Sequence, residues 1–491
     1  MVNPILLIII PLGTAFLVST VASVLKNTTK YLALLALLAE VWISISLLPK
    51  VFEHPINVII AGVKPPLGIN LLVGPLGGIF SLIISVAGVL ILLYSFSYVD
   101  GEHQHKYYTL FLLLITGSQG MILTGDVFNL FVFFEILAIS SYILVGYSEN
   151  RNGFEAAIKY LILGSIGSVF ILVAIALIYQ GTGTLNMADL AGKFGSLAAS
   201  KQLMILVFFI TGMGVEAAIF PLNSWLPDAH SSAPSSISAV LSGFVIEIAL
   251  VVIIKFVYTI FAMTGVLGFL SLLGVVTLLV GEFAAFKQQN IKRVLAYSSI
   301  GQVGLILFAM SLNSKAGLSA GMMQIINHTA SKSILFLAAG YMIKRTGSYE
   351  FSKYRGIARK MPVSSFLFVL GVLSLLGVPP FFGFFSKLNI IIAALHTGST
   401  YYTVLVFLVL LGTVIESIYF LKILQVFYSR DTAAHDAAAS TVKEAPFLPL
   451  FSIALFALVI LLGFLFLPHI TGYTGNVASE LVTKLQIAQV F

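Results

Sequence analysis

The sequence predicts an all-α integral membrane protein with about fourteen transmembrane helices. Of its 491 residues, 59% are hydrophobic and 9% are charged, whereas a soluble domain carries about 25% charged residues on its surface. Apolar stretches of about 20 residues, the length that crosses a bilayer, recur from one end of the chain to the other. We therefore expect a single polytopic membrane domain over residues 1–491, surrounded by lipid.

Fourteen apolar stretches account for most of the chain, and the connections between them are too short for a soluble domain. The first seven predicted spans are 2–24, 31–48, 74–98, 107–123, 127–147, 156–179 and 202–220. The second seven are 236–260, 264–285, 294–312, 317–343, 362–378 (continuing brokenly to 396), 401–428 and 447–470. The first stretch lacks the charged segment and cleavage site of a signal peptide, so we expect it to be retained as a helix.

Three segments outside the predicted spans have sequence patterns that predict secondary structure. In 49–72, apolar and polar residues alternate around a Lys-Pro-Pro turn, which predicts a short external hairpin. In 429–446, charged residues flank an alanine run, which predicts a helix along the cytoplasmic surface. The tail after Pro468 is long enough for a short surface helix only.

The distribution of lysine and arginine predicts the orientation. The odd-numbered loops hold sixteen of these residues, the even-numbered loops and the tail hold seven, and three lie within spans, which makes 26 in all. Cytoplasmic loops are the richer ones, so we expect both termini outside and the chain in the cell membrane. Because the basic residues are spread over many loops, the net charge of +7 does not predict nucleic-acid binding.

Two predicted spans are interrupted by proline next to an ionisable residue. Span seven holds Glu216 and Pro221, and span twelve holds Pro379, Pro380 and Lys387. The breaks lie five spans apart, and a unit of five helices reverses its orientation between copies. Broken helices at corresponding positions of inverted repeats are typical of transporter binding sites.

Ionisable residues inside the spans are the candidates for chemistry. A charge at the bilayer centre costs at least about 2.5–3.5 kcal/mol, so several such groups need partners or water. Buried acids avoid this cost by binding a proton and buried lysines by losing one, so a row of them can pass protons along. The groups are Glu40, Glu135, Glu216, Glu247, Glu282, Glu416, Lys332, Lys387 and Lys422, with His328 beside Lys332.

Structural roles compete with ion transfer at some of these positions. Snorkelling or loop contacts explain three residues near predicted span ends: Glu40, Glu282 and Lys422. His328 and Lys332, spaced i, i+4, share one helix face, which favours a relay.

The role of four further polar residues stays open. Glu416 lies deeper in its span, and either role fits it. In the polar stretch after Pro221, Trp225 and His230 either pack and cap the loop or take part in transfer, and Asp228 is an additional candidate.

The sequence offers no site for a cofactor. It contains no cysteine, which excludes disulfides, thiolate metal sites and cysteine-ligated iron–sulfur clusters within the chain. Nucleotide, metal and nucleophile motifs are missing from the sequence around the buried charges. We therefore expect no cofactor and no catalytic residue in this chain, and any redox chemistry belongs to partner subunits.

Six stretches in order resemble the antiporter-like subunits of respiratory complex I (the M and N type), of Mrp-type cation/proton antiporters (the D type) and of membrane-bound hydrogenases. They are GDVFNLFVFFEILAISSYILVGY, AAIKYLILGSIGS with YQGTGTLNM, PLNSWLPDAHSSAP, NIKRVLAYSSIGQVG, NHTASKSILFL and GVPPFFGFFSK. The resemblance runs from about residue 70 to 430. It implies fourteen helices, with inverted repeats over spans 4–8 and 9–13, and a central row of carboxylates, lysines and histidines.

The resemblance also implies a division of the chain. We expect N-terminal helices in 1–106, a first repeat in 107–260, a second repeat in 264–428, and a surface segment, last helix and tail in 429–491. The family's span-five glutamate matches Glu135, its histidine and span-eleven lysine match His328 and Lys332, and its span-twelve lysine matches Lys387.

The chain departs from the family where its first broken span begins. Most members carry lysines in spans seven and eight where this chain has Glu216 and Glu247, and often aspartates where it has Gly74 and Asn290. Glu135, Glu216 and Glu247 would then form a group of acids without a basic partner in their own spans, and cannot all ionise cheaply. Three outcomes are open: proton transfer by a modified route, binding of a cation such as sodium, or a silent first half-channel.

We interpret the chain as a proton- or sodium-translocating subunit of a redox-driven membrane complex of the complex I or hydrogenase type. Its partners would be other membrane subunits, including redox subunits with iron–sulfur clusters, besides lipid and the transported ion. The alternatives are a subunit of a redox-free Mrp-type antiporter and a largely structural spacer.

Overall fold

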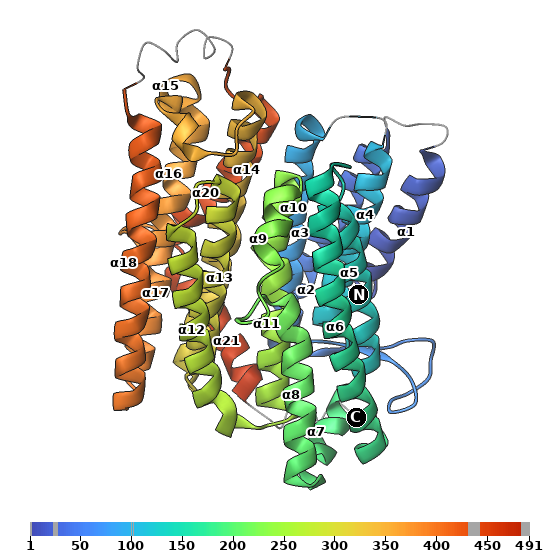
Figure 1. The fold of residues 1–491 in the computed structure, drawn as a ribbon. Helices are drawn as coiled ribbons and strands as arrows, with labels where there is room; N and C mark the ends of the chain where they lie inside the picture. Colours follow the sequence, from blue (N-terminus) through green and yellow to red (C-terminus); the bar gives the residue numbers. More distant parts are fainter. Residues whose placement is uncertain (1, 23–27, 100, 102, 431–441, 483–491) are drawn as a thin grey trace.

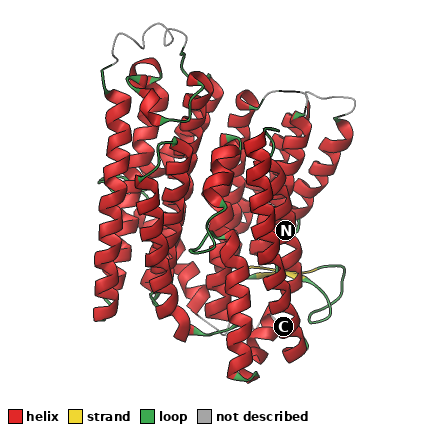
Figure 2. Ribbon diagram, viewed as in Figure 1, coloured by secondary structure: helices red, strands yellow, loops and turns green. Residues whose placement is uncertain are grey.

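The computed structural model describes residues 2–22, 28–99, 101, 103–430 and 442–482, and these form a bundle of long, roughly parallel helices (Figures 1 and 2). The helices of the first half are α1 (Leu6–Val21), α2 (Thr29–Glu53), α3 (Pro75–Tyr98), α4 (Gln104–Leu123), α5 (Val127–Val145), α6 (Arg151–Thr182), α7 (Met187–Lys193), α8 (Ala199–Glu216), α9 (Leu226–Ser232), α10 (Ser235–Val240) and α11 (Ile246–Lys255). Those of the second half are α12 (Leu267–Phe286), α13 (Ile291–Met310), α14 (Lys315–Thr346), α15 (Ile357–Lys360), α16 (Pro362–Leu376), α17 (Phe382–Leu395), α18 (Thr400–Tyr428), α20 (Phe447–Leu462) and α21 (Leu467–Val482).

Each of the fourteen predicted spans contains a helix, and the predicted all-α membrane class is confirmed. Nine helical stretches of the described chain are long and apolar enough to cross a membrane, and a bent pair, α20 with α21, raises this to ten. Three shorter apolar helices, α1, α16 and α17, occupy the first predicted span and the two halves of the twelfth.

The predicted external hairpin is also present. Strands β1 (Ile56–Ile59) and β2 (Asn70–Val73) pair antiparallel, with Ile56 opposite Val73. Asn70 joins this hairpin to the bundle, because its side chain accepts a hydrogen bond from Asn186 Nδ2 at 3.0 Å.

The two predicted helix breaks lie where the prolines are. α8 ends at Glu216, and Pro221 lies in the irregular stretch before α9 begins at Leu226. α16 ends at Leu376, and the next residue, Gly377, has a φ of +77°, the left-handed conformation that favours glycine at a helix C-terminus. Pro379 and Pro380 follow, and α17 begins at Phe382. Prolines cannot donate the helical hydrogen bond, so each span is divided into two short helices.

The C-terminal region differs from the prediction. The expected single span over 447–470 is wrong, because α20 ends at Leu462 and α21 leaves it at an angle of 90°. Pro468 starts the new helix, where a missing backbone N–H costs nothing. The buried side chains of α21 lie on one face, which packs against α14 and α3. α21 corresponds to the short helix expected in the tail after Pro468, with one face packed against the bundle as in other amphipathic helices.

A carboxylate of α21 also reaches the N-terminus of α3. Glu480 Oε2 accepts a hydrogen bond from Leu76 N at 2.7 Å. A Cβ atom added at Gly74 would overlap the same carboxylate, so the glycine leaves room for it. The C-terminal helix is therefore fixed to the start of α3.

Other expectations stay untested. Residues 431–441 of the predicted surface helix lie outside the described residues. The predicted division into N-terminal helices and two repeats remains a prediction, although α14 packs against helices of both halves, including α10, α3, α16 and α17.

Close helix contacts at glycines yield a stability prediction. A Cβ atom at Gly274 of α12 would lie 2.7 Å from Phe308 N of α13, so Gly274→Ala should push the two helices apart. We expect it to destabilise the protein by about 1–3 kcal/mol, the cost of overpacking, seen as a lower melting temperature of the purified protein. Gly268→Ala on the same helix meets nothing within 4 Å and is the control; equal melting temperatures of both variants would contradict the packing.

Candidate functional site: a buried row of acids, histidines and lysines

The first part of the row joins α5, α6 and the broken end of α8. Glu216, the last residue of α8, accepts a hydrogen bond from the Tyr160 hydroxyl of α6 at 2.7 Å. Glu135 of α5 accepts one from Ser168 of α6. The two carboxylates interact electrostatically, and Tyr142 lies close to both. Two predicted acids are thus brought together, with hydroxyl groups as their partners.

Trp225 fixes the irregular stretch after Pro221. Its ring stacks on Tyr160 with centroids 3.7 Å apart and planes at 4°. Its Nε1 donates a hydrogen bond to Val215 O at 2.8 Å. Of the two roles that the sequence left open, the structure therefore gives Trp225 the packing role.

The second part of the row crosses between the two halves of the chain. Glu247 of α11 hydrogen-bonds His328 Nδ1 of α14 and accepts a hydrogen bond from the Thr329 hydroxyl at 3.1 Å. Glu247 and His328 are fully buried. The sequence predicts Glu135, Glu216 and Glu247 without a basic partner in their own spans, and the partner of Glu247 comes from another span, a histidine of the second half. Sequence spacing could not show this contact, which joins residues 81 positions apart.

A π-helical turn immediately precedes Glu247. The segment Leu241–Val245 (η3) lies between α10 and α11, and a second π-helical turn, Phe256–Ile260 (η4), follows α11. Such turns are rare in proteins, and many of those that occur lie at functional sites.

Lys332 lies one turn beyond His328 on α14 but contacts α13. Its ammonium donates to Ser298 Oγ at 2.7 Å and to Leu295 O at 3.1 Å. The two residues share a helix, as predicted, while their hydrogen-bond partners come from different neighbouring helices. Lys332 is therefore placed to carry a proton between the α11 and α13 sides of α14.

His230 is buried beside this part of the row. It is not exposed, and its ring stacks on Phe336 of α14 with centroids 4.8 Å apart. Neither ring nitrogen has a hydrogen-bond partner among the described residues. Lys292, which the sequence placed in a loop, is buried nearby and donates to Ala233 O. The packing and transfer roles of His230 thus both remain compatible with its position.

The third part of the row lies between α17 and α18. Lys387 Nζ and Glu416 Oε2 form an ion pair of 2.8 Å. Glu416 Oε1 accepts from Gln302 Nε2 at 2.8 Å, and Gln302 Oε1 accepts from Gln324 Nε2 at 2.7 Å. Gln324 in turn accepts from Ser386 Oγ at 2.5 Å, beside Lys387. The structure therefore gives Glu416 a direct partner in the row.

Two residues assigned to span ends behave differently from each other. Glu282 is buried. Its Oε2 accepts a hydrogen bond of 2.8 Å from the hydroxyl of Tyr419, and Tyr419 lies on the same helix as Glu416. Lys422 is exposed and lies over the Phe351 ring at 6.0 Å, as expected of a snorkelling lysine. The snorkelling interpretation thus fits Lys422 and is wrong for Glu282.

Sequence reasoning also missed the neutral members of the row. Hydroxyl and amide groups separate most of the ionisable ones: Tyr160, Ser168, Ser298, Gln302, Gln324, Thr329, Ser386 and Tyr419. A glutamine inside an apolar stretch, such as Gln302 or Gln324, was the available signal. Single serines and tyrosines are common in membrane helices and give none.

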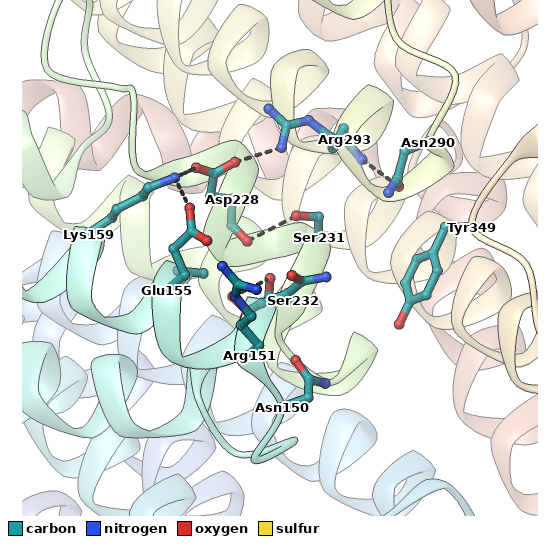
Figure 3. A pocket seen from close by; sticks show the side chains of 12 residues that line it. Asn150, Arg151, Glu155, Lys159, Asp228, Ser231, Ser232, Asn290, Arg293 and Tyr349 are labelled. Carbon is teal, nitrogen blue, oxygen red and sulfur yellow. Dashed lines mark hydrogen bonds and ion pairs between the residues drawn. The ribbon is translucent and has the colours of Figure 1, made fainter.

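Asp228 lies at the border of a polar cavity of about 590 Å³ rather than in the row (Figure 3). Its carboxylate pairs with Lys159 of α6 at 2.9 Å and with Arg293 of α13 at 2.6 Å. Partial burial raises the pKa of Asp228, but hydrogen bonds from these two cations outweigh it and hold the pKa below its usual value. Asp228 thus ties α9 to both halves of the chain.

The described residues contain no group of three or more histidine, aspartate and glutamate side chains arranged for a metal ion. The row instead alternates acids, bases and neutral hydrogen-bonding groups. Such a series transfers protons by making and breaking hydrogen bonds between neighbours.

Comparison with known proteins agrees with this geometry. The family described as NADH:quinone oxidoreductase/Mrp antiporter, transmembrane, matches residues 124–416. The N-type subunit of the NADH-quinone oxidoreductase of Desulforudis audaxviator is 33% identical over 438 residues, 87% of this chain and 86% of the relative. The D-type subunit of the Na(+)/H(+) antiporter of Alkalihalophilus pseudofirmus is 32% identical over 366 residues, 73% of this chain and 74% of the relative.

Solved structures show the same similarity. A chain of the membrane-bound sulfane sulfur reductase, an archaeal respiratory membrane complex, superposes with a TM-score of 0.91 and 35% identity over 99% of both chains. A chain of the Mrp complex from Dietzia sp. has the same fold, with a TM-score of 0.89 and 23% identity over 99% of this chain and 98% of that one. The chain belongs to the NADH:quinone oxidoreductase/Mrp antiporter family of membrane subunits.

Proposed function

We propose that the chain is the proton- or sodium-translocating, antiporter-like subunit of a redox-driven membrane complex of the complex I or membrane-bound hydrogenase type. The observation that carries this proposal is the contact between Glu247 and His328, fully buried groups of opposite type that join the two halves of the chain. A buried acid–base contact of this kind is expensive in a membrane and marks ion pathways.

The proposed route follows the buried row. It runs from Glu135 and Glu216 to Glu247 and His328, and then through Lys332 toward Lys387 and Glu416. His230 is an additional member, because its free ring nitrogens lie beside α14. Asp228 has a structural role at the border of the polar cavity, where its ion pairs with Lys159 and Arg293 hold α9 in place.

In the first half, we infer proton transfer by a modified route. Where relatives place lysine, Glu216 has a tyrosine hydroxyl as its partner, and Glu135 has a serine. Glu216 Oε2 has no hydrogen-bond partner within the described part of the chain, so it is free to exchange a proton. Binding of a cation by these oxygens and a silent half-channel are the competing outcomes.

The curated relatives of the redox-driven and antiporter types are similarly identical, at 33% and 32%, and a solved structure supports the redox-driven type. The relative from the sulfane sulfur reductase is 35% identical over nearly the whole chain, whereas the one from the Mrp complex is 23% identical. Iron–sulfur partner subunits are part of the proposal, and the alternatives are an Mrp-type antiporter and a structural spacer.

We further propose that the protein lies in the plasma membrane with both termini outside. The excess of lysine and arginine in the odd-numbered loops supports this orientation. In this orientation the β1–β2 hairpin and α7 are external, and the Asp228 cavity faces the cytoplasm.

Affinity purification of the intact complex from its native membrane tests the complex type. We expect iron–sulfur subunits to co-purify, with acid-labile sulfide and visible absorbance that bleaches on reduction. Isolation with membrane subunits only, and without iron, would instead support the redox-free antiporter.

Glu247→Gln tests the row. Glutamine keeps the shape and hydrogen bonds to Thr329 and His328 but cannot carry a proton, so we expect proton translocation in vesicles to fall by roughly a hundredfold or more. Glu53→Gln changes an exposed acid at the end of α2 and is the control. Translocation at the control's rate, in complexes of normal subunit content, would exclude Glu247 from the route.

Glu216→Gln separates the three outcomes for the first half. A loss of proton translocation as large as that of Glu247→Gln is expected if the modified proton route operates. A loss confined to sodium-dependent activity would identify a cation site instead. Unchanged translocation of either ion would show that the first half-channel is silent.

A further inference from the structure

A second buried polar cluster lies in the N-terminal helices, apart from the row. Glu40 lies near the middle of α2 rather than near its end, and it is not exposed. Ser85 of α3 and Gln119 of α4 hydrogen-bond to its carboxylate, Ser44 of α2 and Ser81 of α3 lie next to these two residues, and all four are buried. These helices are drawn in blue in Figure 1, and α3 also packs against α10, α14 and α20.

The carboxylate of Glu40 is poorly satisfied by its neighbours. Oε2 accepts only two long hydrogen bonds, of 3.4 Å each, from Ser85 Oγ and Gln119 Nε2. Oε1 has no hydrogen-bond partner among the described residues, and none of their lysines, arginines or histidines forms an ion pair with Glu40. Leaving a buried carboxylate in this state is costly.

Two further oxygen atoms of this cluster are also unpartnered, and the backbone carbonyl of Ser81 accepts hydrogen bonds from Ser85 Oγ at 2.7 Å and from Gln119 Nε2 at 3.3 Å. Ser81 Oγ and Gln119 Oε1 have no hydrogen-bond partner within the described part of the chain. The single hydroxyl proton of Ser85 has two possible acceptors, Ser81 O at 2.7 Å and Glu40 Oε2 at 3.4 Å, and Ser85 Oγ lies 3.3 Å from Ser44 Oγ. The cluster therefore offers one carboxylate, three hydroxyls and an amide oxygen.

We propose that Glu40, Ser81, Ser85 and Gln119 form a binding site for a hard monovalent cation, Na⁺, between α2, α3 and α4. Hard cations take carboxylate, carbonyl and hydroxyl oxygens as ligands. One carboxylate balances one positive charge, so the loaded site is neutral inside the membrane, whereas a divalent ion would leave a net charge. Rotation of the Gln119 amide exchanges its oxygen and nitrogen and turns the oxygen toward the ion.

The site is independent of the row and of the proposed function. It uses none of the residues between Glu135 and Glu416, and its test measures binding rather than transport. Failure of the cation site would leave the proposed route intact, and failure of the route would leave the cation site intact.

Carbodiimide labelling of the intact complex in its membrane tests the site. Dicyclohexylcarbodiimide reacts with protonated carboxyls in apolar surroundings, and the exposed Leu38 and Trp42 place this part of α2 at the lipid. We expect peptide mass spectrometry to find Glu40 labelled in sodium-free medium. At a Na⁺ concentration about ten times its Kd, labelling should slow about tenfold, because only the ion-free fraction reacts; K⁺ at equal ionic strength should protect much less.

Matched variants identify the ligands. Ser85→Ala should keep the labelling of Glu40 but weaken its protection by Na⁺, whereas Ser46→Ala on α2, whose hydroxyl bonds only to Trp42 O, should not. Equal labelling in Na⁺ and K⁺ would overturn the proposal. If Glu40 is not labelled at all, retention of ²²Na⁺ by the purified complex decides: loss of one bound ion in Glu40→Gln supports the site, and no difference from the unaltered complex refutes it.

Discussion

The cost of holding charge away from water governs this structure. Each buried acid of the row has a hydroxyl, amide, histidine or ammonium group against it, and the partner usually comes from a different helix. The polar contacts therefore hold neighbouring helices together in addition to their apolar packing. The same contacts that stabilise the bundle are those that can exchange a proton, so stability and transport depend on one set of atoms.

The two halves of the chain neutralise their buried acids with different groups. In the second half, Lys387 neutralises Glu416 directly, and two glutamines extend the contact toward α13 and α14. In the first half, the described residues give Glu135 and Glu216 hydroxyl partners and no ion pair, which is why we propose a proton as the means of neutralising them. Glu247 connects the two arrangements, because it originates in the first half and pairs with His328 of the second.

Much of the fold could be predicted from the sequence because hydrocarbon imposes a simple length rule on helices. The breaks at Pro221 and Pro379 were predictable for the same reason, since proline cannot continue a helical hydrogen-bond ladder. A short helix was expected after Pro468, but the packing of α21 against α14 and α3 depends on tertiary contacts that its composition does not show. Glu40 and Glu282 were misjudged because distance from a predicted helix end says nothing about which neighbours cover a side chain. The contact of Glu247 with His328 depends on tertiary packing, so neither segment's sequence predicts it.

The carboxylate of Glu480 at the start of α3 has a consequence for comparing relatives. The resemblance leads us to expect an aspartate at the position of Gly74 in many members of the family, whereas this chain has a glycine there. In space the acid is present, delivered by a helix from the opposite end of the chain and hydrogen-bonded to Leu76 N. A carboxylate can thus occupy this place although it comes from a distant segment, and removing α21 would remove a group that the first hundred residues do not contain.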